Sequence, residues 1–176
     1  KDTAITSSMI FFILLGAEIL KGFFSRANLP AYMAEAAATS GFDPWLVMVL
    51  MLLALILLGC FMESLSMIVV VIPFFWPALV DINGGDWATA ATAAYGMGTE
   101  DLKIWFGILA LIVVELGLIT PPVGLNVFII NALAKGVPMS QTFRGVMPFF
   151  SAEIVRILLL IFAPILTLFV PTILGN

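Results

Sequence analysis

Two adjacent prolines interrupt one of the most apolar stretches of this chain. The segment 113–131 reads VVELGLITPPVGLNVFIIN, and apolar residues continue on both sides, from Ile104 to Ala134. Each proline removes a backbone donor and its ring clashes with the preceding turn, and the residue before a proline is pushed out of helical geometry. The pattern therefore predicts a helix over 104–134 that is broken at 120–124.

The composition restricts the chain to one class of protein. Hydrophobic residues make up 62% of it, charged residues only 10%, and the mean hydropathy is +1.20. Soluble domains are near half apolar and a quarter charged, and several runs here approach the ~20 residues that cross a bilayer. We expect an all-α integral membrane protein whose partners include the lipid bilayer. Irregular backbone at membrane depth is tolerated only where protein buries it or it lines a cavity, so the break predicts a binding site. A proline kink without a ligand is the alternative.

Several functions are excluded by what the sequence lacks. The net charge is -4, and no basic cluster suggests a nucleic acid partner. Cys60 is the only cysteine and histidine is absent, so an internal disulfide is impossible and a haem or His-ligated metal is not expected. No nucleophile–base pair or phosphate loop is present, and we do not expect an enzyme. The chain begins at Lys1 without a methionine, and we expect it to be a fragment of a longer protein.

The remaining segments are read from their apolar runs and turn residues. Residues 1–43 are expected to hold a membrane helix and an interfacial helix, and 146–172 the last membrane helix, with Glu153 and Arg156 paired on one face. Segment 44–80 is predicted to be a re-entrant hairpin with its tip near 59–64. Its first arm has about 14 residues, or roughly 21 Å, which is short of a ~30 Å core. A continuous span with Glu63 inside it is the alternative. Segment 81–103 is predicted to be an extramembrane loop with room for a short helix over 87–95.

Glu63 is the most informative ionisable residue. A carboxylate at mid-depth costs roughly 2.5–3.5 kcal/mol, and such groups usually face a cavity, an ion or a partner. The sequence therefore predicts an ion or proton site at the hairpin tip. A protonated Glu63 bonded to Ser64 or to a neighbouring chain is the alternative.

Two interrupted apolar elements, about 60 residues apart, are typical of secondary transporters. The N-termini of half-helices suit a carboxylate substrate, and a hard cation prefers oxygen ligands. The predicted Na⁺-binding residues carry side-chain or backbone oxygens at the two interruptions: Gly59, Glu63, Ser64, Gly117, Thr120 and Gly124. The predicted substrate-binding residues lie in the second interruption: Pro121, Pro122 and Asn126.

Basic residues in short loops predict the orientation. Loop 135–145 contains Lys135 and Arg144 and no acidic residue, whereas 81–103 is acidic. We expect 135–145 to face the cytoplasm, and both 81–103 and the C-terminus to lie outside.

Three runs carry a resemblance to a known family. GCFMESLSMIVVVIPFFWP (59–77), WFGILALIVVELGLITPPVGLNVFIINALAKG (105–136) and PFFSAEIVRILLLIFAPILTLFVP (148–171) resemble the large membrane subunit of tripartite ATP-independent periplasmic (TRAP) transporters. The resemblance implies a Na⁺-coupled permease of the bacterial inner membrane that imports an organic acid, of the C4-dicarboxylate or sialic acid type. It also implies a periplasmic substrate-binding protein and a small four-helix membrane subunit as partners, and no cofactor besides the coupling ion.

The resemblance also implies a fold. The chain would be the C-terminal inverted repeat of an elevator-type transporter, with a scaffold helix in 1–43, a re-entrant hairpin and a discontinuous helix. Glu63 and Thr120 would help to bind one Na⁺, although the family usually has Asp at the hairpin tip. An N-terminal repeat would supply the other half of the site. A dicarboxylate/Na⁺ elevator carrier without a binding protein, and a non-transporting assembly subunit, are the alternatives.

Overall fold

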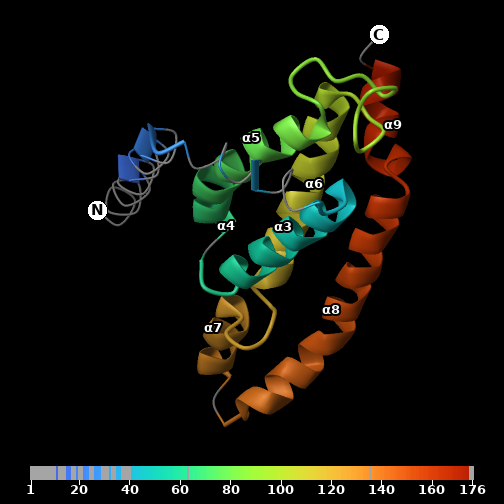
Figure 1. Cartoon of the computed structure of the whole chain (residues 1–176). Helices are drawn as coiled ribbons and strands as arrows, with labels where there is room; N and C mark the ends of the chain where they lie inside the picture. Colours follow the sequence, from blue (N-terminus) through green and yellow to red (C-terminus); the bar gives the residue numbers. More distant parts are fainter. Residues whose placement is uncertain are drawn as a thin grey trace.

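The computed structural model describes residues 41–62, 64–134 and 136–174, together with scattered positions between 11 and 36. In these residues the chain is helical and has no strand (Figure 1). Most of segment 1–43, with its predicted membrane and interfacial helices, lies outside the described residues, and so do Glu63 and Lys135.

Segment 44–80 folds as two helical arms joined by a turn. Helix α3 spans Pro44–Gly59, and its first turn is stabilised by Asp43, whose side chain accepts a hydrogen bond from the Trp45 amide at 2.9 Å. The turn follows at 60–62. The second arm consists of α4 (Ser64–Ser66), a π-helical stretch η1 (Met67–Val71) and α5 (Ile72–Asn83). The π stretch ends just before Pro73, whose ring would clash with the preceding turn of a regular α-helix.

The loop between the arms and the next helix is shorter than predicted. Helix α5 continues to Asn83 and ends at Gly84, which has a φ of 114°, and α6 already begins at Thr99. The segment 87–95 forms turns rather than the short helix that the sequence allowed. Its backbone is held instead by Asn83, whose side chain bonds the Tyr95 amide and the Met97 carbonyl. Acidic residues at 100 and 101 favour the early start of α6, because they lie in its first turn.

The segment 104–134 is divided into two helices. Helix α6 spans Thr99–Gly117 and α7 spans Leu125–Leu133, with irregular backbone between them. The interruption begins at Leu118, two residues before the predicted start. This difference follows from Pro121, which lacks the amide hydrogen that would have bonded the carbonyl of Gly117. The Thr120 amide bonds that carbonyl instead, at 3.0 Å, and closes the last turn.

The C-terminal helix begins earlier than predicted and is not continuous. Helix α8 spans Met139–Phe162, so it includes part of the predicted loop 135–145, and α9 spans Ile165–Leu174. Pro164 interrupts the run, because it cannot donate the next helical hydrogen bond. The predicted pair of Glu153 and Arg156 is confirmed, with 2.6 Å between Oε2 and Nη2. Among the described helices, α8 alone is both long and apolar enough to cross a membrane.

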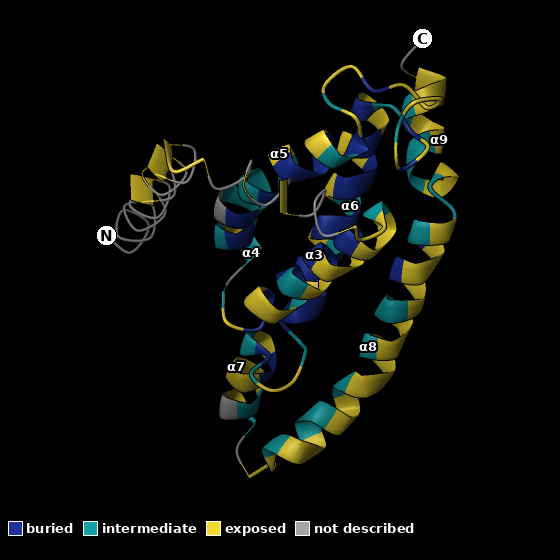
Figure 2. Ribbon diagram, in the orientation of Figure 1, coloured by how far each residue is buried: buried dark blue, intermediate teal, exposed yellow. Residues whose placement is uncertain are grey.

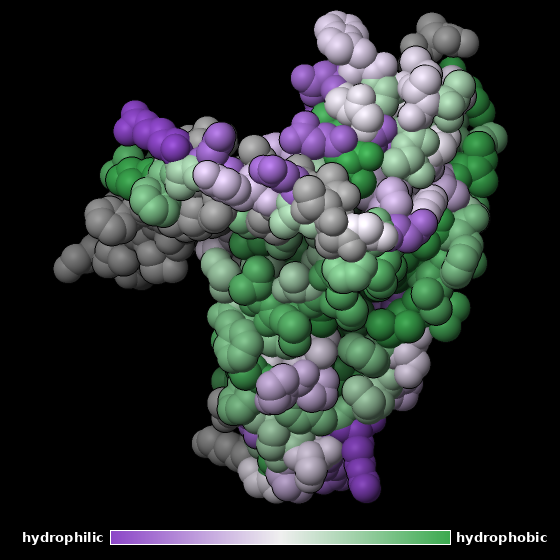
Figure 3. Space-filling model, viewed as in Figure 1, coloured by the Kyte–Doolittle hydropathy of each residue, from purple (hydrophilic) through white to green (hydrophobic). Residues whose placement is uncertain are grey.

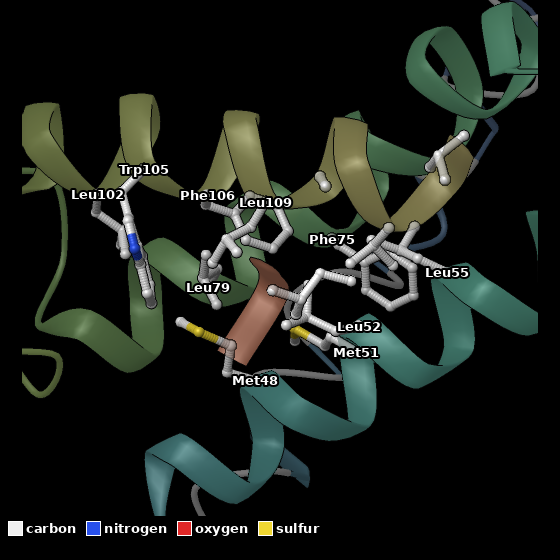
Figure 4. Packing of buried hydrophobic residues seen from close by; sticks show 14 of the residues in the cluster. Met48, Met51, Leu52, Leu55, Phe75, Leu79, Leu102, Trp105, Phe106 and Leu109 are labelled. Atoms are coloured by element: carbon white, nitrogen blue, oxygen red, sulfur yellow. The ribbon is translucent and has the colours of Figure 1, made fainter. Parts of the chain in front are cut away.

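The core lies where the hairpin packs on α6. Buried side chains from α3, from the second arm and from α6 pack against one another there (Figure 4). The ribbon is coloured as buried at the same place (Figure 2). Representative residues with almost no exposed surface are Met48, Leu55, Leu79, Trp105, Phe106 and Leu109. By contrast, most of the surface of α8 and α9 is exposed. The contact between the hairpin and α6 therefore fixes how the two interrupted elements lie relative to each other.

The surface of the described chain is largely apolar. Hydrophobic residues cover the middle of the face seen in Figure 3, and hydrophilic residues gather toward its upper and lower ends. Many large apolar side chains on α3, α7, α8 and α9 are exposed. This distribution, together with the all-helical fold, is consistent with an integral membrane protein.

Candidate functional site

The two interruptions lie against each other at a pair of glycines. Gly59 ends α3 and Gly117 ends α6, and both are buried. A Cβ atom built on Gly117 would lie 2.8 Å from the Cα of Gly59 and 2.8 Å from the carbonyl oxygen of Ile56. The backbones of the two helices are therefore in direct contact at this point. The absence of a side chain on both residues allows this approach.

A second contact links the hairpin turn to the helix break. The Cys60 thiol donates a weak hydrogen bond to the carbonyl oxygen of Thr120, with 3.5 Å between sulfur and oxygen. Cys60 is completely buried in the described chain. No role was predicted for Cys60, because no histidine is present to activate its thiol as a nucleophile. Its position directly after Gly59, at the predicted hairpin tip, was the available signal.

Thr120 presents oxygen atoms at the contact. Its hydroxyl donates a hydrogen bond to the carbonyl of Leu116 at 2.6 Å, and this bond uses its only hydrogen. A hydroxyl oxygen also has two lone pairs, which remain able to coordinate a cation. Among the described residues, the carbonyl of Thr120 accepts only the weak thiol bond. The half-buried Thr120 therefore offers two oxygens that a hard cation such as Na⁺ can bind.

The irregular backbone of the break is itself well fixed. The amide of Asn126 bonds the carbonyl of Leu118 at 3.1 Å across the interruption. Gly124, at the start of α7, has a φ of 56°, and a Cβ atom there would lie 3.2 Å from the Thr120 carbonyl oxygen. Only glycine adopts this left-handed geometry readily, and its missing side chain also leaves room for Thr120. The N-terminus of α7, with its partial positive charge, is thus held next to the Thr120 carbonyl.

The structure brings together some of the predicted site residues and not others. Gly59, Gly117, Thr120 and Gly124 lie in one contact region, as the distances above show. Ser64 is half-buried at the first residue of α4, and Glu63 is outside the described residues. The predicted substrate-binding residues are all exposed: Pro121, Pro122 and Asn126. Their side chains are therefore accessible to a ligand at the break.

The described residues contain no group of three or more His, Cys, Asp or Glu side chains that could hold a metal ion. A divalent metal centre built from such ligands is therefore not found in this part of the chain. The oxygens that the described residues place near the break are hydroxyl and carbonyl oxygens. Oxygen ligands of this kind suit a hard cation better than a soft transition metal.

Comparison with known families decides the class of the protein. Residues 1–166 match the family described as the tripartite ATP-independent periplasmic transporter, DctM component. The chain belongs to this family. The resemblance seen in the three sequence runs is therefore confirmed.

Curated relatives of the TRAP family cover almost all of the chain. It is 27% identical over 167 residues to the C4-dicarboxylate TRAP transporter large permease protein DctM of Pseudomonas aeruginosa, covering 95% of this chain and 35% of the relative. It is 25% identical over 171 residues to the sialic acid TRAP transporter large permease protein SiaM of Vibrio cholerae, covering 97% and 36%. An isethionate TRAP transporter permease protein of Oleidesulfovibrio alaskensis is 24% identical over 168 residues, covering 96% and 24%.

The chain spans about a third of the length of the first curated relatives it matches. No solved structure matches it.

Proposed function

We propose that this chain forms part of the large permease of a TRAP transporter, and that the whole protein imports an organic acid across the bacterial inner membrane, coupled to Na⁺. The relatives are named for C4-dicarboxylates, sialic acid and isethionate, and all three are organic acids. We therefore expect the substrate to be an organic anion. A periplasmic substrate-binding protein delivers it, and a small membrane subunit completes the transporter.

One observation supports this proposal most strongly. The turn of the hairpin and the break of the discontinuous helix meet at Gly59 and Gly117, and the oxygens of Thr120 lie at the same contact. A secondary transporter needs a site at which interrupted helices offer backbone groups to an ion and a substrate. In this proposal Thr120 binds Na⁺ together with Glu63 and nearby carbonyls, and the N-terminus of α7 attracts the substrate anion.

The same proposal assigns the arrangement in the membrane. The hairpin of 44–80 is re-entrant from the periplasmic side, the chain is the C-terminal repeat of an elevator-type carrier, and the C-terminus is periplasmic. Loop 84–98 then faces the periplasm. The exposed apolar surfaces of α8 and α9 face lipid or the remainder of the transporter.

Uptake by the reconstituted transporter tests the function. The full-length permease with its small subunit is placed in liposomes, and uptake of labelled C4-dicarboxylates, sialic acid and isethionate is followed with the binding protein outside. We expect uptake only with an inward Na⁺ gradient, and loss of uptake in Glu63→Ala. Uptake without the binding protein would instead identify a binding-protein-independent carrier, and uptake indifferent to Na⁺ would contradict the coupling. No uptake of any organic acid would favour an assembly subunit.

A further inference from the structure

We propose that Gly59 and Gly117 are positioning residues of the ion site, and that their backbone contact fixes the place of the Thr120 oxygens. The inference rests on the proposed Na⁺ coupling and deepens it. It assigns the two glycines a steric role, since the contact between them requires that neither has a side chain. It concerns a contact between the hairpin turn and the helix break, which are 58 residues apart in sequence (117 − 59).

The contact leaves less room for a side chain at Gly117 than at Gly59. A Cβ atom on Gly117 would lie 2.8 Å from the Gly59 Cα, 2.8 Å from the Ile56 oxygen and 2.9 Å from the Gly59 carbonyl carbon. A Cβ atom on Gly59 would lie 3.0 Å from the Val114 oxygen and 3.2 Å from the Gly117 Cα. All of these neighbours are backbone atoms, so no side-chain rotation can relieve the overlap. A methyl group at position 117 must separate α3 from α6, and one at position 59 must do so to a smaller extent.

Separating α3 from α6 would displace Thr120 through its contacts with both helices. On α6, the carbonyl of Gly117 accepts the Thr120 amide at 3.0 Å, and the Leu116 carbonyl just before it accepts the Thr120 hydroxyl at 2.6 Å. On α3, Gly59 directly precedes Cys60, whose thiol contacts the Thr120 carbonyl. Both oxygens of Thr120 are thus fixed by groups within one residue of the glycine contact.

The same helix provides a matched control. Gly107 lies in the middle of α6, and a Cβ atom on it would have nothing within 4 Å. Alanine at that position adds the same methyl group to the same helix without a steric clash, and it slightly stabilises the helix. A series of Gly117→Ala, Gly59→Ala and Gly107→Ala therefore separates the contact from general effects of replacing glycine.

The functional test measures Na⁺ dependence in the reconstituted full-length transporter with its binding protein. For each variant, the Na⁺ concentration for half-maximal uptake and the maximal rate are determined separately. We expect Gly117→Ala to raise the half-maximal Na⁺ concentration by about tenfold or more, because small displacements of binding groups have large effects. Gly59→Ala should raise it less, and Gly107→Ala should leave it unchanged. Because Gly59→Ala is the milder change, it serves as the test if Gly117→Ala does not fold.

A second readout does not depend on transport. Cys60 is completely buried beside the contact. The rate at which its thiol is alkylated therefore reports whether the hairpin turn packs against the helix break. In the purified full-length complex, with any other cysteines replaced, we expect slow alkylation in the wild type and in Gly107→Ala. In the absence of Na⁺, alkylation of Cys60 should be several times faster in Gly117→Ala than in the wild type.

The outcomes distinguish this inference from the proposed function. Na⁺-dependent uptake with equal half-maximal Na⁺ concentrations in all three variants would overturn the positioning role alone. Equal alkylation rates in Gly117→Ala and the wild type would likewise show that the glycine contact does not hold the turn against the helix break. Wild-type uptake that is indifferent to Na⁺ would overturn the coupling itself and the positioning role with it.

Discussion

The indole nitrogen of Trp105 donates a hydrogen bond to the carbonyl oxygen of Leu160, with 2.8 Å between the two atoms. In a continuous helix this carbonyl would accept the amide of residue 164, but Pro164 has no amide hydrogen. Trp105 therefore replaces the hydrogen bond that the proline removes. The bond joins the buried face of α6 to the end of α8, where the C-terminal helix is interrupted.

The first prediction follows from this bond. Trp105→Phe keeps an aromatic ring but removes the donor, so the buried Leu160 carbonyl loses its partner. We expect a loss of stability of about 1–3 kcal/mol, seen as a lower thermal unfolding midpoint of the purified full-length permease. Trp87 is 93% exposed, and Trp87→Phe is the control that should leave the midpoint unchanged. Equal midpoints for both variants would show that the bond contributes nothing.

A second prediction concerns the loop between α5 and α6. Asn83 has no exposed surface, and its side chain bonds the Tyr95 amide and the Met97 carbonyl, each at 3.2 Å. Asn83→Ala leaves both backbone groups without these partners, so we expect faster cleavage of the segment 84–98 by a protease added on the loop side. Asp86→Ala changes an exposed side chain of the same loop and should be cut at close to the wild-type rate. Unchanged cleavage of Asn83→Ala would mean that other bonds hold the loop.

The third prediction is a pH dependence at Tyr95, in the same loop. Burial, and then the negative charge of Asp43, raise the pKa of the Tyr95 phenol above its ordinary value of 10.0. The folded state therefore favours the neutral phenol, which donates a hydrogen bond to the Pro44 carbonyl at 3.1 Å. This contribution is complete below about pH 10 and is lost as the pH rises through the pKa of the folded state. Tyr95→Phe should remove this part of the decline in thermal stability above pH 10, and an identical decline in the variant would contradict the assignment.

Much of the fold could be predicted from the sequence, because prolines and glycines mark its interruptions. The Pro121–Pro122 pair predicted the break between α6 and α7, and the short apolar run after Pro44 predicted the first arm of a hairpin. The comparisons confirm the family that these runs resemble. The re-entrant course of the hairpin, the elevator motion and the orientation remain predictions.

Some boundaries could not be predicted, because they depend on contacts between residues that lie apart in the chain. The extension of α5 to Asn83 and the turns of 84–98 depend on the buried Asn83 side chain, which looks like an ordinary loop residue in the sequence. The early start of α8 at Met139 placed most of the predicted loop 135–145 in a helix.

The candidate site was predicted in part. Glycines at 59 and 117 were selected as sources of carbonyl oxygens, whereas the structure shows a direct backbone contact between them. Their steric fit cannot be seen in the sequence, because it depends on how α3 and α6 cross. The thiol of Cys60 was missed for the same reason. The binding roles of all the predicted site residues stay predictions: Gly59, Glu63, Ser64, Gly117, Thr120, Pro121, Pro122, Gly124 and Asn126.

The most direct test of the central claim is the Na⁺ dependence of uptake in Thr120→Val, measured with the reconstituted full-length transporter. Valine keeps the branched shape and removes the hydroxyl oxygen proposed to bind Na⁺. Thr172→Val is the matched control, because Thr172 makes the same type of bond to the carbonyl four residues earlier, at 2.7 Å, but on α9.

A hydrogen bond to a charged group is worth about 1.5–3 kcal/mol, and we take the same magnitude for one oxygen ligand of Na⁺, which is about tenfold and more in affinity. We therefore predict that Thr120→Val raises the half-maximal Na⁺ concentration at least about tenfold and that Thr172→Val leaves it unchanged. The same half-maximal Na⁺ concentration in Thr120→Val and in the wild type would contradict a Na⁺ site at the helix break.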